Sequence, residues 1–164
     1  MAELFKVYFE IRGTGDANSP YNDPTLCHST APVSDPANVT KNLANPVFKG
    51  SGAGWDKYGV REAEILKGPE YFHIFYGGYN GKIWQIGHVR TKDFKIFEAN
   101  PYNPIFTPNK DLDAWDSSQL LTPQVFELNE KFYMLYAGLK GSGWGGKAEC
   151  YSGLAVARGR KTGE

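Results

Sequence analysis

Residues 54–78 read GWDKYGVREAEILKGPEYFHIFYGG, and residues 114–138 read AWDSSQLLTPQVFELNEKFYMLYAG. The two stretches align without a gap at an offset of 60 residues, so that Trp55 matches Trp115 and Tyr76 matches Tyr136. A repeat at a fixed period indicates an architecture of stacked, similar units. This repeat is therefore the basis for interpreting the rest of the chain.

The repeating unit has the pattern of a small antiparallel sheet. In its complete middle copy, a Trp-Asp turn precedes four apolar stretches that we expect to be strands, at residues 60–67, 71–77, 83–90 and 94–99. The phrase Asn-Pro-Ile-Phe closes this copy at residues 103–106, and Asn-Pro-Val-Phe closes the copy before it at residues 45–48. A unit with two apolar faces must stack on its neighbours, which is the logic of a β-propeller blade.

The other two copies are partial. The first begins at its second strand, FKVYF at residues 5–9, and the third follows the pattern only as far as GLAVA at residues 153–157. We therefore expect an all-β, β-propeller-like fold with about two and a half four-stranded antiparallel blades, incomplete as a single chain.

We assign one domain over residues 1–164, divided into a partial blade (1–48), a full blade (49–108) and a partial blade (109–164). Cut blades leave unpaired strand edges, and two copies would supply about five blades, so we expect a homodimer.

Composition excludes several classes of function. Eighteen basic and eighteen acidic residues balance, so neither nucleic acid nor an anionic membrane is an expected partner. No apolar run reaches the roughly 20 residues of a spanning helix, and no signal-peptide pattern occurs at the N-terminus, so we expect a soluble protein, cytoplasmic by default. Cys27 and Cys150 form no CxxC pair and the three histidines lack ligand spacing, so free thiols and no cofactor or metal are expected.

The phrases GWDKYGVREAEILK, YFHIFYGG, WQIGHVRTKDF and NPIF resemble the blade signature of the five-bladed β-propeller glycosidases. This group includes the arabinanases and xylosidases of glycoside hydrolase family 43, the invertases of family 32 and the mannoside phosphorylases of family 130. The resemblance covers nearly the whole chain and is more specific for fold than for activity. It implies that the innermost strand of each blade lines a central funnel, where carboxylates at the strand starts act on a glycosidic bond.

Carried onto this sequence, the resemblance singles out Glu62 and Glu64 in the funnel strand VREAEILK. If the module is catalytic, Glu62 is the expected general acid and Glu64 a second carboxylate or a modulator of its pKa. Strand alternation would place the two glutamates on one face and Arg61 on the other, as an ion-pair partner or a substrate clamp. The alternative is a purely structural role for both carboxylates. The third copy has Thr122 and Pro123 at the positions that match Glu62 and Ala63.

Three aromatic residues beside loops between strands, Tyr79, Trp84 and Trp144, are candidates for stacking on sugar rings or for ordinary packing. Asp56 and Asp116 follow tryptophan in a turn, where we expect them to cap amide groups and hold the repeat together. Two functions remain open. One is a carbohydrate-active module that hydrolyses glycosidic bonds, and the other is a non-catalytic sugar-binding or assembly module. The sequence identifies neither the sugar nor whether the chain is an enzyme.

Overall fold

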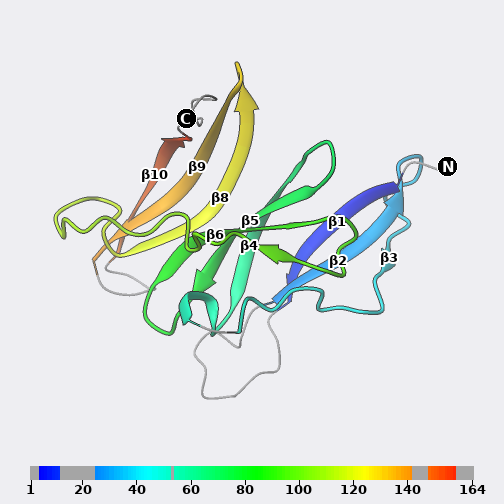
Figure 1. The fold of residues 1–164 in the computed structure, drawn as a ribbon, viewed down its shortest axis with the longest axis horizontal. Coiled ribbons are helices and arrows are strands. Elements are labelled where there is room, and N and C mark those ends of the chain that lie inside the picture. Colours follow the sequence, from blue (N-terminus) through cyan, green and yellow to red (C-terminus); the bar gives the residue numbers. More distant parts are fainter. Residues whose placement is uncertain (1–3, 12–24, 53, 142–147, 158–164) are drawn as a thin grey trace.

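The computed structural model describes residues 4–11, for which only the backbone is considered, and residues 25–52, 54–141 and 148–157. These residues form ten strands in three antiparallel sheets, one short 3-10 helix, η1 (Gly54–Asp56), and no α-helix (Figure 1). The first sheet contains β1 (Leu4–Ile11), β2 (Thr25–Pro32) and β3 (Thr40–Lys41). The middle sheet contains β4 (Val60–Lys67), β5 (Phe72–Tyr79), β6 (Trp84–Thr91) and β7 (Glu98–Ala99). The third sheet contains β8 (Gln119–Leu128), β9 (Lys131–Lys140) and β10 (Glu149–Val156).

The all-β, propeller-like fold is confirmed. The middle sheet lies between the other two, and each sheet follows the strand order of the chain (Figure 1). The ten strands amount to two and a half four-stranded units, distributed over three sheets in the described part of the chain. The homodimer expected from the sequence stays a prediction. None of the described residues forms a helix that could span a lipid bilayer.

The Trp-Asp turn is fixed by glycines in the strands beneath it. The Trp55 ring lies over Gly78 and Gly87, where a Cβ atom would come within 2.2 Å and 2.1 Å of the ring. Trp115 lies in the same way over Gly138, where the nearest ring atom would be 2.5 Å from a Cβ. Real Cβ atoms do not approach other atoms so closely, because interiors are already close-packed. Tryptophan and glycine therefore recur together at the repeat period.

The aspartates of these turns are buried and hydrogen-bonded. Asp56 is fully buried and accepts hydrogen bonds from the Tyr76 hydroxyl at 3.0 Å and from the Ser51 amide at 2.8 Å. Asp116 accepts a hydrogen bond from the Tyr136 hydroxyl at 3.1 Å. The amide capping expected from the sequence is confirmed for Asp56. Each Asp-Tyr pair ties the turn to the second strand of its sheet.

The closing phrases join each sheet to the next. The Asn103 side chain accepts a hydrogen bond from the His88 amide and donates one to the His88 carbonyl, both at 2.9 Å. Phe106 then forms a β-bridge with Ile86 and packs edge-on against Tyr136 of the third sheet, at 4.9 Å between ring centroids. The first copy makes the same contacts through Asn45, His28, Leu26, Phe48 and Tyr76.

The strand expected to begin at Phe94 is shorter than predicted, because β7 begins only at Glu98. The Asp93 carboxylate accepts hydrogen bonds from the amides of Lys95 and Ile96, which turns the chain. Phe94 has a left-handed backbone with φ of 59° and is buried between the first and middle sheets. The residues before β7 therefore form a turn that delivers an aromatic ring into the core.

Candidate functional site

The first strands of the middle and third sheets, β4 and β8, contact each other and carry matching irregularities. In each strand a β-bulge interrupts the pairing register near the strand start. Glu62 in β4 and Thr122 in β8 lie in these bulges, and both have a left-handed backbone, with φ of 54° and 48°. Positive φ is uncommon for residues other than glycine, and bulges often re-aim a side chain beside a functional site. The two bulges thus mark one repeated position at the junction of the sheets.

The bulge in β4 changes which side chains share a face. Arg61 is paired with Gly77 and Glu64 with Phe75, so that three steps along β4 match two steps along β5. Cross-strand partners project to the same side of a sheet, which places Arg61 and Glu64 together. The expectation that Arg61 points away from Glu64 was wrong, because strict alternation holds only in a strand without a bulge.

The Glu62 carboxylate links the two sheets. One of its oxygens accepts a hydrogen bond from the Thr122 amide at 3.0 Å, and the other lies 3.3 Å from a guanidinium nitrogen of Arg61. The side chain is 24% exposed, so the carboxylate is held in place and still reaches solvent. A second carboxylate is not present at the matching position, where the third sheet has Thr122.

The other predicted binding residues lie in the core. The Arg61 guanidinium lies 4.3 Å from the centre of the Trp84 ring, which is fully buried, and Tyr79 stacks on Trp84 at 4.8 Å. Leu121 from the third sheet belongs to the same cluster. Packing between sheets, the alternative left open by the sequence, accounts for Trp84 and Tyr79 in this structure. Trp144 lies outside the described residues.

Glu64 is partly buried on the face that also carries Phe75. Burial raises the pKa of the Glu64 carboxyl above its usual value, because the charged form loses hydration. A carboxyl group in such surroundings holds its proton more readily than one in water. Glu62 and Glu64 therefore have different environments although they lie two residues apart.

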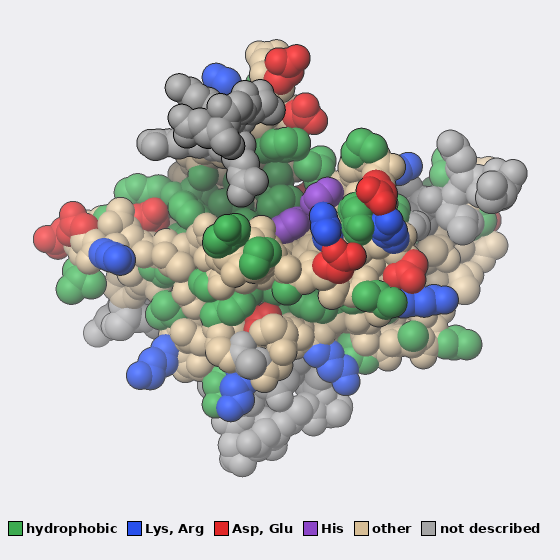
Figure 2. Space-filling view, in the orientation of Figure 1, with side chains coloured by type: hydrophobic (Ala, Val, Ile, Leu, Met, Phe, Trp, Pro, Cys, Tyr) green, Lys and Arg blue, Asp and Glu red, His purple; other side chains and the backbone are tan. Residues whose placement is uncertain are grey.

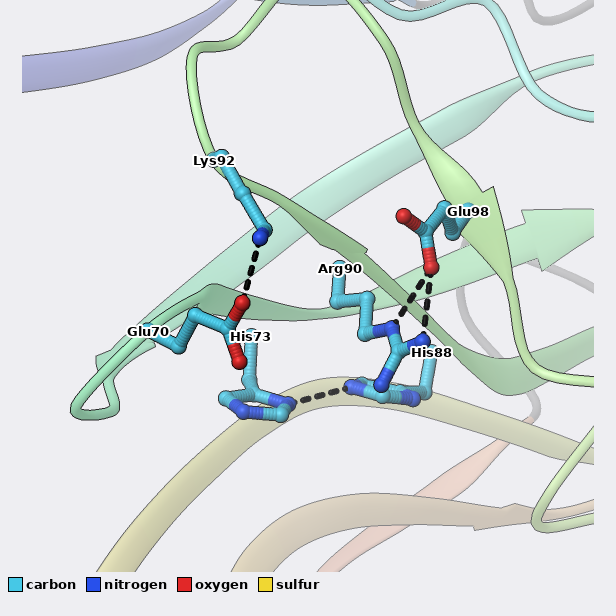
Figure 3. A network of polar contacts seen from close by, with 6 residues as sticks. All are labelled: Glu70, His73, His88, Arg90, Lys92 and Glu98. Carbon is cyan, nitrogen blue, oxygen red and sulfur yellow. Dashed lines mark hydrogen bonds and ion pairs between the residues drawn. The ribbon is translucent and has the colours of Figure 1, made fainter.

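A histidine pair lies farther along the same face of the middle sheet (Figure 3). His73 Nδ1 and His88 Nε2 are 3.1 Å apart, and the rings stack at 5.3 Å. The amide nitrogen of Asn100 lies 3.4 Å from His88 Nδ1, which assigns Nδ1 as an acceptor and Nε2 as the donor to His73. Burial, followed by the nearby His73 and Arg90, lowers the pKa of His88 to about 4. His88 is therefore neutral at ordinary pH.

Two ion pairs flank the histidines, Arg90 with Glu98 and Lys92 with Glu70 (Figure 3). The contact between His73 and His88 was not predicted from the sequence, although the antiparallel alignment of their two strands could have suggested it. The part of the chain that the structure describes holds no cluster of three or more histidine, cysteine, aspartate or glutamate side chains suited to a metal ion. Cys27 and Cys150 are both free thiols.

Comparison with known proteins agrees with the geometry. No family model matches the chain. A β-1,2-mannobiose phosphorylase from Thermoanaerobacter sp. (strain X514) is 26% identical over 104 residues, which cover 55% of this chain and 33% of that protein. The chain therefore spans about a third of the length of this relative.

Solved structures share the fold at low sequence identity. A GH32 β-fructofuranosidase from Bombyx mori, in complex with sucrose, has a TM-score of 0.69 at 19% identity, over 93% of this chain and 31% of the other. A family 117 glycoside hydrolase from Zobellia galactanivorans has a TM-score of 0.68 at 16% identity, over 94% and 48%. A xylan β-1,4-xylosidase from Bacillus halodurans C-125 has a TM-score of 0.67 at 11% identity, over 97% and 30%. The chain thus shares its fold with part of each of these glycoside hydrolases.

Proposed function

We propose that this chain is a carbohydrate-binding module of the propeller-glycosidase type, and that β4 and β8 form its sugar-contacting surface. The observation that carries the proposal is the position of Glu62 in the bulge of β4. Its carboxylate is held by the Thr122 amide and by Arg61 and still reaches solvent. A carboxylate that is already fixed and partly desolvated accepts hydrogen bonds from sugar hydroxyls with little further loss of conformational entropy.

The names of similar proteins support carbohydrate as the ligand class. A mannobiose phosphorylase, a β-fructofuranosidase and a xylosidase all take their names from sugars or sugar polymers. Binding is the first choice over catalysis because cleavage of a glycosidic bond requires two carboxyl groups on opposite sides of the sugar. Glu62 and Glu64 come from a single strand, and Thr122 occupies the repeated position on the neighbouring strand.

Isothermal titration calorimetry with β-1,2-mannobiose, sucrose and xylobiose tests the proposal. The wild-type chain should bind at least one of these sugars, and Glu62→Gln should weaken that binding about tenfold or more, since a hydrogen bond to a charged group is worth roughly 1.5–3 kcal/mol. Glu127→Gln, at an exposed site near the end of β8, is the matched control and should bind as the wild type does. Absence of binding at millimolar sugar, or equal loss in both variants, would refute the proposal.

A second candidate is cleavage of the glycosidic bond, and the surroundings of Glu64 favour it. Because burial raises the pKa of Glu64, this residue is the better proton donor to the leaving glycosidic oxygen, and Glu62 is the second carboxylate. This reverses the roles expected from the sequence.

Leaving-group dependence separates the two carboxylates. Glu64→Gln should retain turnover of nitrophenyl glycosides, whose leaving group needs no proton, and lose turnover of alkyl glycosides. Glu62→Gln should lose both. Assays with and without inorganic phosphate distinguish phosphorolysis from hydrolysis. Absence of wild-type turnover on all substrates would remove this candidate and leave sugar binding to be judged by calorimetry.

A further inference from the structure

An apolar groove of about 350 Å³ lies between the middle and third sheets. Hydrophobic side chains gather next to histidine side chains on the face shown in Figure 2. The groove is lined by Phe75, Ile105, Phe106, Val125, Phe132, Tyr133, Met134, Ala155, Val156 and Ala157. These side chains are mostly apolar. Glu62 is not among the residues that line the groove.

The junction between the first and middle sheets shows how the same fold fills such a space. There the turn before β7 inserts Phe94, which is only 3% exposed. The Phe94 ring stacks on His28 at 5.0 Å and contacts Phe72 at 4.8 Å. Phe97, from the same turn, contacts Phe48 at 5.1 Å. Two aromatic rings from one segment therefore complete the core of this junction.

The groove is the repeat counterpart of this filled junction. Phe132, Met134 and Val125 line the groove, and they lie 60 residues after Phe72, Ile74 and Ile65 of the filled core. Phe132 is nevertheless 44% exposed, whereas Phe72 is partly buried against the core.

No described residue supplies counterparts of Phe94 and Phe97 to the groove. Among the described residues, the groove therefore has the walls of the filled junction without its aromatic insert.

The backbone beside the groove offers a matching strand edge. In the middle sheet, β6 pairs with β7 through Val89 with Ala99 and through Arg90 with Glu98. The register of the third sheet places Ala155 and Val156 of β10 at the positions of Val89 and Arg90. Among the described residues, β10 is paired on one side only, with β9. An open strand edge beside an apolar groove can accept an extended segment as an added strand.

We propose that the groove and the β10 edge together bind a polypeptide segment of a partner protein, which adds a fourth strand and inserts a phenylalanine-type ring. The filled junction within this chain is the template for the interaction. In it, one continuous segment supplies both the strand and the ring. The inserted ring meets Phe132, as Phe94 meets Phe72. This inference does not depend on whether the module binds sugar.

A synthetic peptide of residues 91–106, TKDFKIFEANPYNPIF, is the probe, because it contains the template strand, turn and closing phrase. Fluorescence anisotropy of the labelled peptide with the whole chain should show saturable binding. A peptide with Phe94→Ala should bind about tenfold more weakly or worse, since a buried aromatic ring dominates such contacts. In the chain, Phe132→Ala should weaken binding by a similar factor. Phe126→Ala is the matched control, because Phe126 is 38% exposed and does not line the groove.

Each alternative outcome counts against the proposal. If the peptide does not bind, or if the Phe94→Ala peptide binds equally well, the groove is not a site for an inserted ring. Light scattering on the chain alone tests a second copy as the occupant. A wild-type dimer that Phe132→Ala dissociates, and Phe126→Ala does not, would assign the groove to self-association in place of a partner segment.

Discussion

The packing of Trp55 on Gly78 predicts that a single methyl group is not tolerated there. In Gly78→Ala, the new Cβ would lie 2.2 Å and 2.7 Å from two atoms of the Trp55 ring and 2.8 Å from Asp56 Cβ. The Trp55 ring cannot shift across the sheet to relieve this overlap, because it also lies against Gly87. Overpacking of a tight core typically costs about 1–3 kcal/mol. With overlap against two residues, we expect a loss of about 3 kcal/mol or more.

The adjacent glycine provides the control. A Cβ at Gly77 would meet the Arg61 carbonyl oxygen and the Trp84 ring at 3.5 Å, which is ordinary van der Waals contact. Gly77→Ala should therefore be neutral or stabilise the fold by about 0.4–1 kcal/mol, because alanine lowers the entropy of the unfolded chain. Both substitutions lie in the same strand and add the same atom.

Thermal unfolding followed by tryptophan fluorescence measures the difference. About 3 kcal/mol corresponds to a fall in Tm of roughly 6–12 °C for a chain of this size. Gly77→Ala should unfold at or above the wild-type temperature. Equal Tm values for the two variants would show that the close approach of tryptophan and glycine does not hold the turn, and the structural explanation of the repeat would fail.

Three further predictions concern the core and its titratable groups. Burial and the hydrogen bond to Asp116 raise the pKa of Tyr136 to about 12. The stability that this residue contributes below pH 10 should therefore be lost as the pH rises toward 12. Urea unfolding at several pH values should show a smaller loss for Tyr136→Phe. The pKa of His88 is lowered from 6.5 to about 4, so neutral His88 contributes to the free energy of unfolding above pH 6.5, and this contribution is lost as the pH falls toward 4. His88→Gln should therefore make the free energy of unfolding less sensitive to acid. Phe94→Ala should cost about 3–5 kcal/mol in urea unfolding, as expected for a phenylalanine buried in a core, and a loss below about 1 kcal/mol would contradict its placement.

Much of the fold could be predicted from the sequence, because the tryptophans and the glycines that they pack against recur at the same period. Trp55 and Gly78 recur with Trp115 and Gly138, and a chain that repeats such pairs repeats the sheet around them. The strand over residues 60–67 was predicted with its observed bounds. The turn at Phe94 was missed because its hydrophobic pattern continues that of a strand, whereas the Asp93 carboxylate ends the pairing by binding two later amides.

The candidate site could be predicted only in part. The resemblance singled out Glu62 and Glu64 on the innermost, funnel-lining strand of the blade, but alternation gave the wrong orientation for Arg61. A β-bulge adds one residue to one strand, and the pairing partners that reveal it are distant in sequence. The burial of Trp84 likewise depends on the third sheet, which contributes Leu121 to the same cluster.

The binding of sugar along β4 and β8 beside Glu62 is best examined in a crystal structure of the chain soaked with the sugar that binds most tightly. We expect electron density for the sugar at the junction of these strands, with a hydroxyl within hydrogen-bond distance of the Glu62 carboxylate. Sugar density only in the apolar groove or on the outer strands, with Glu62 free of contact, would contradict it.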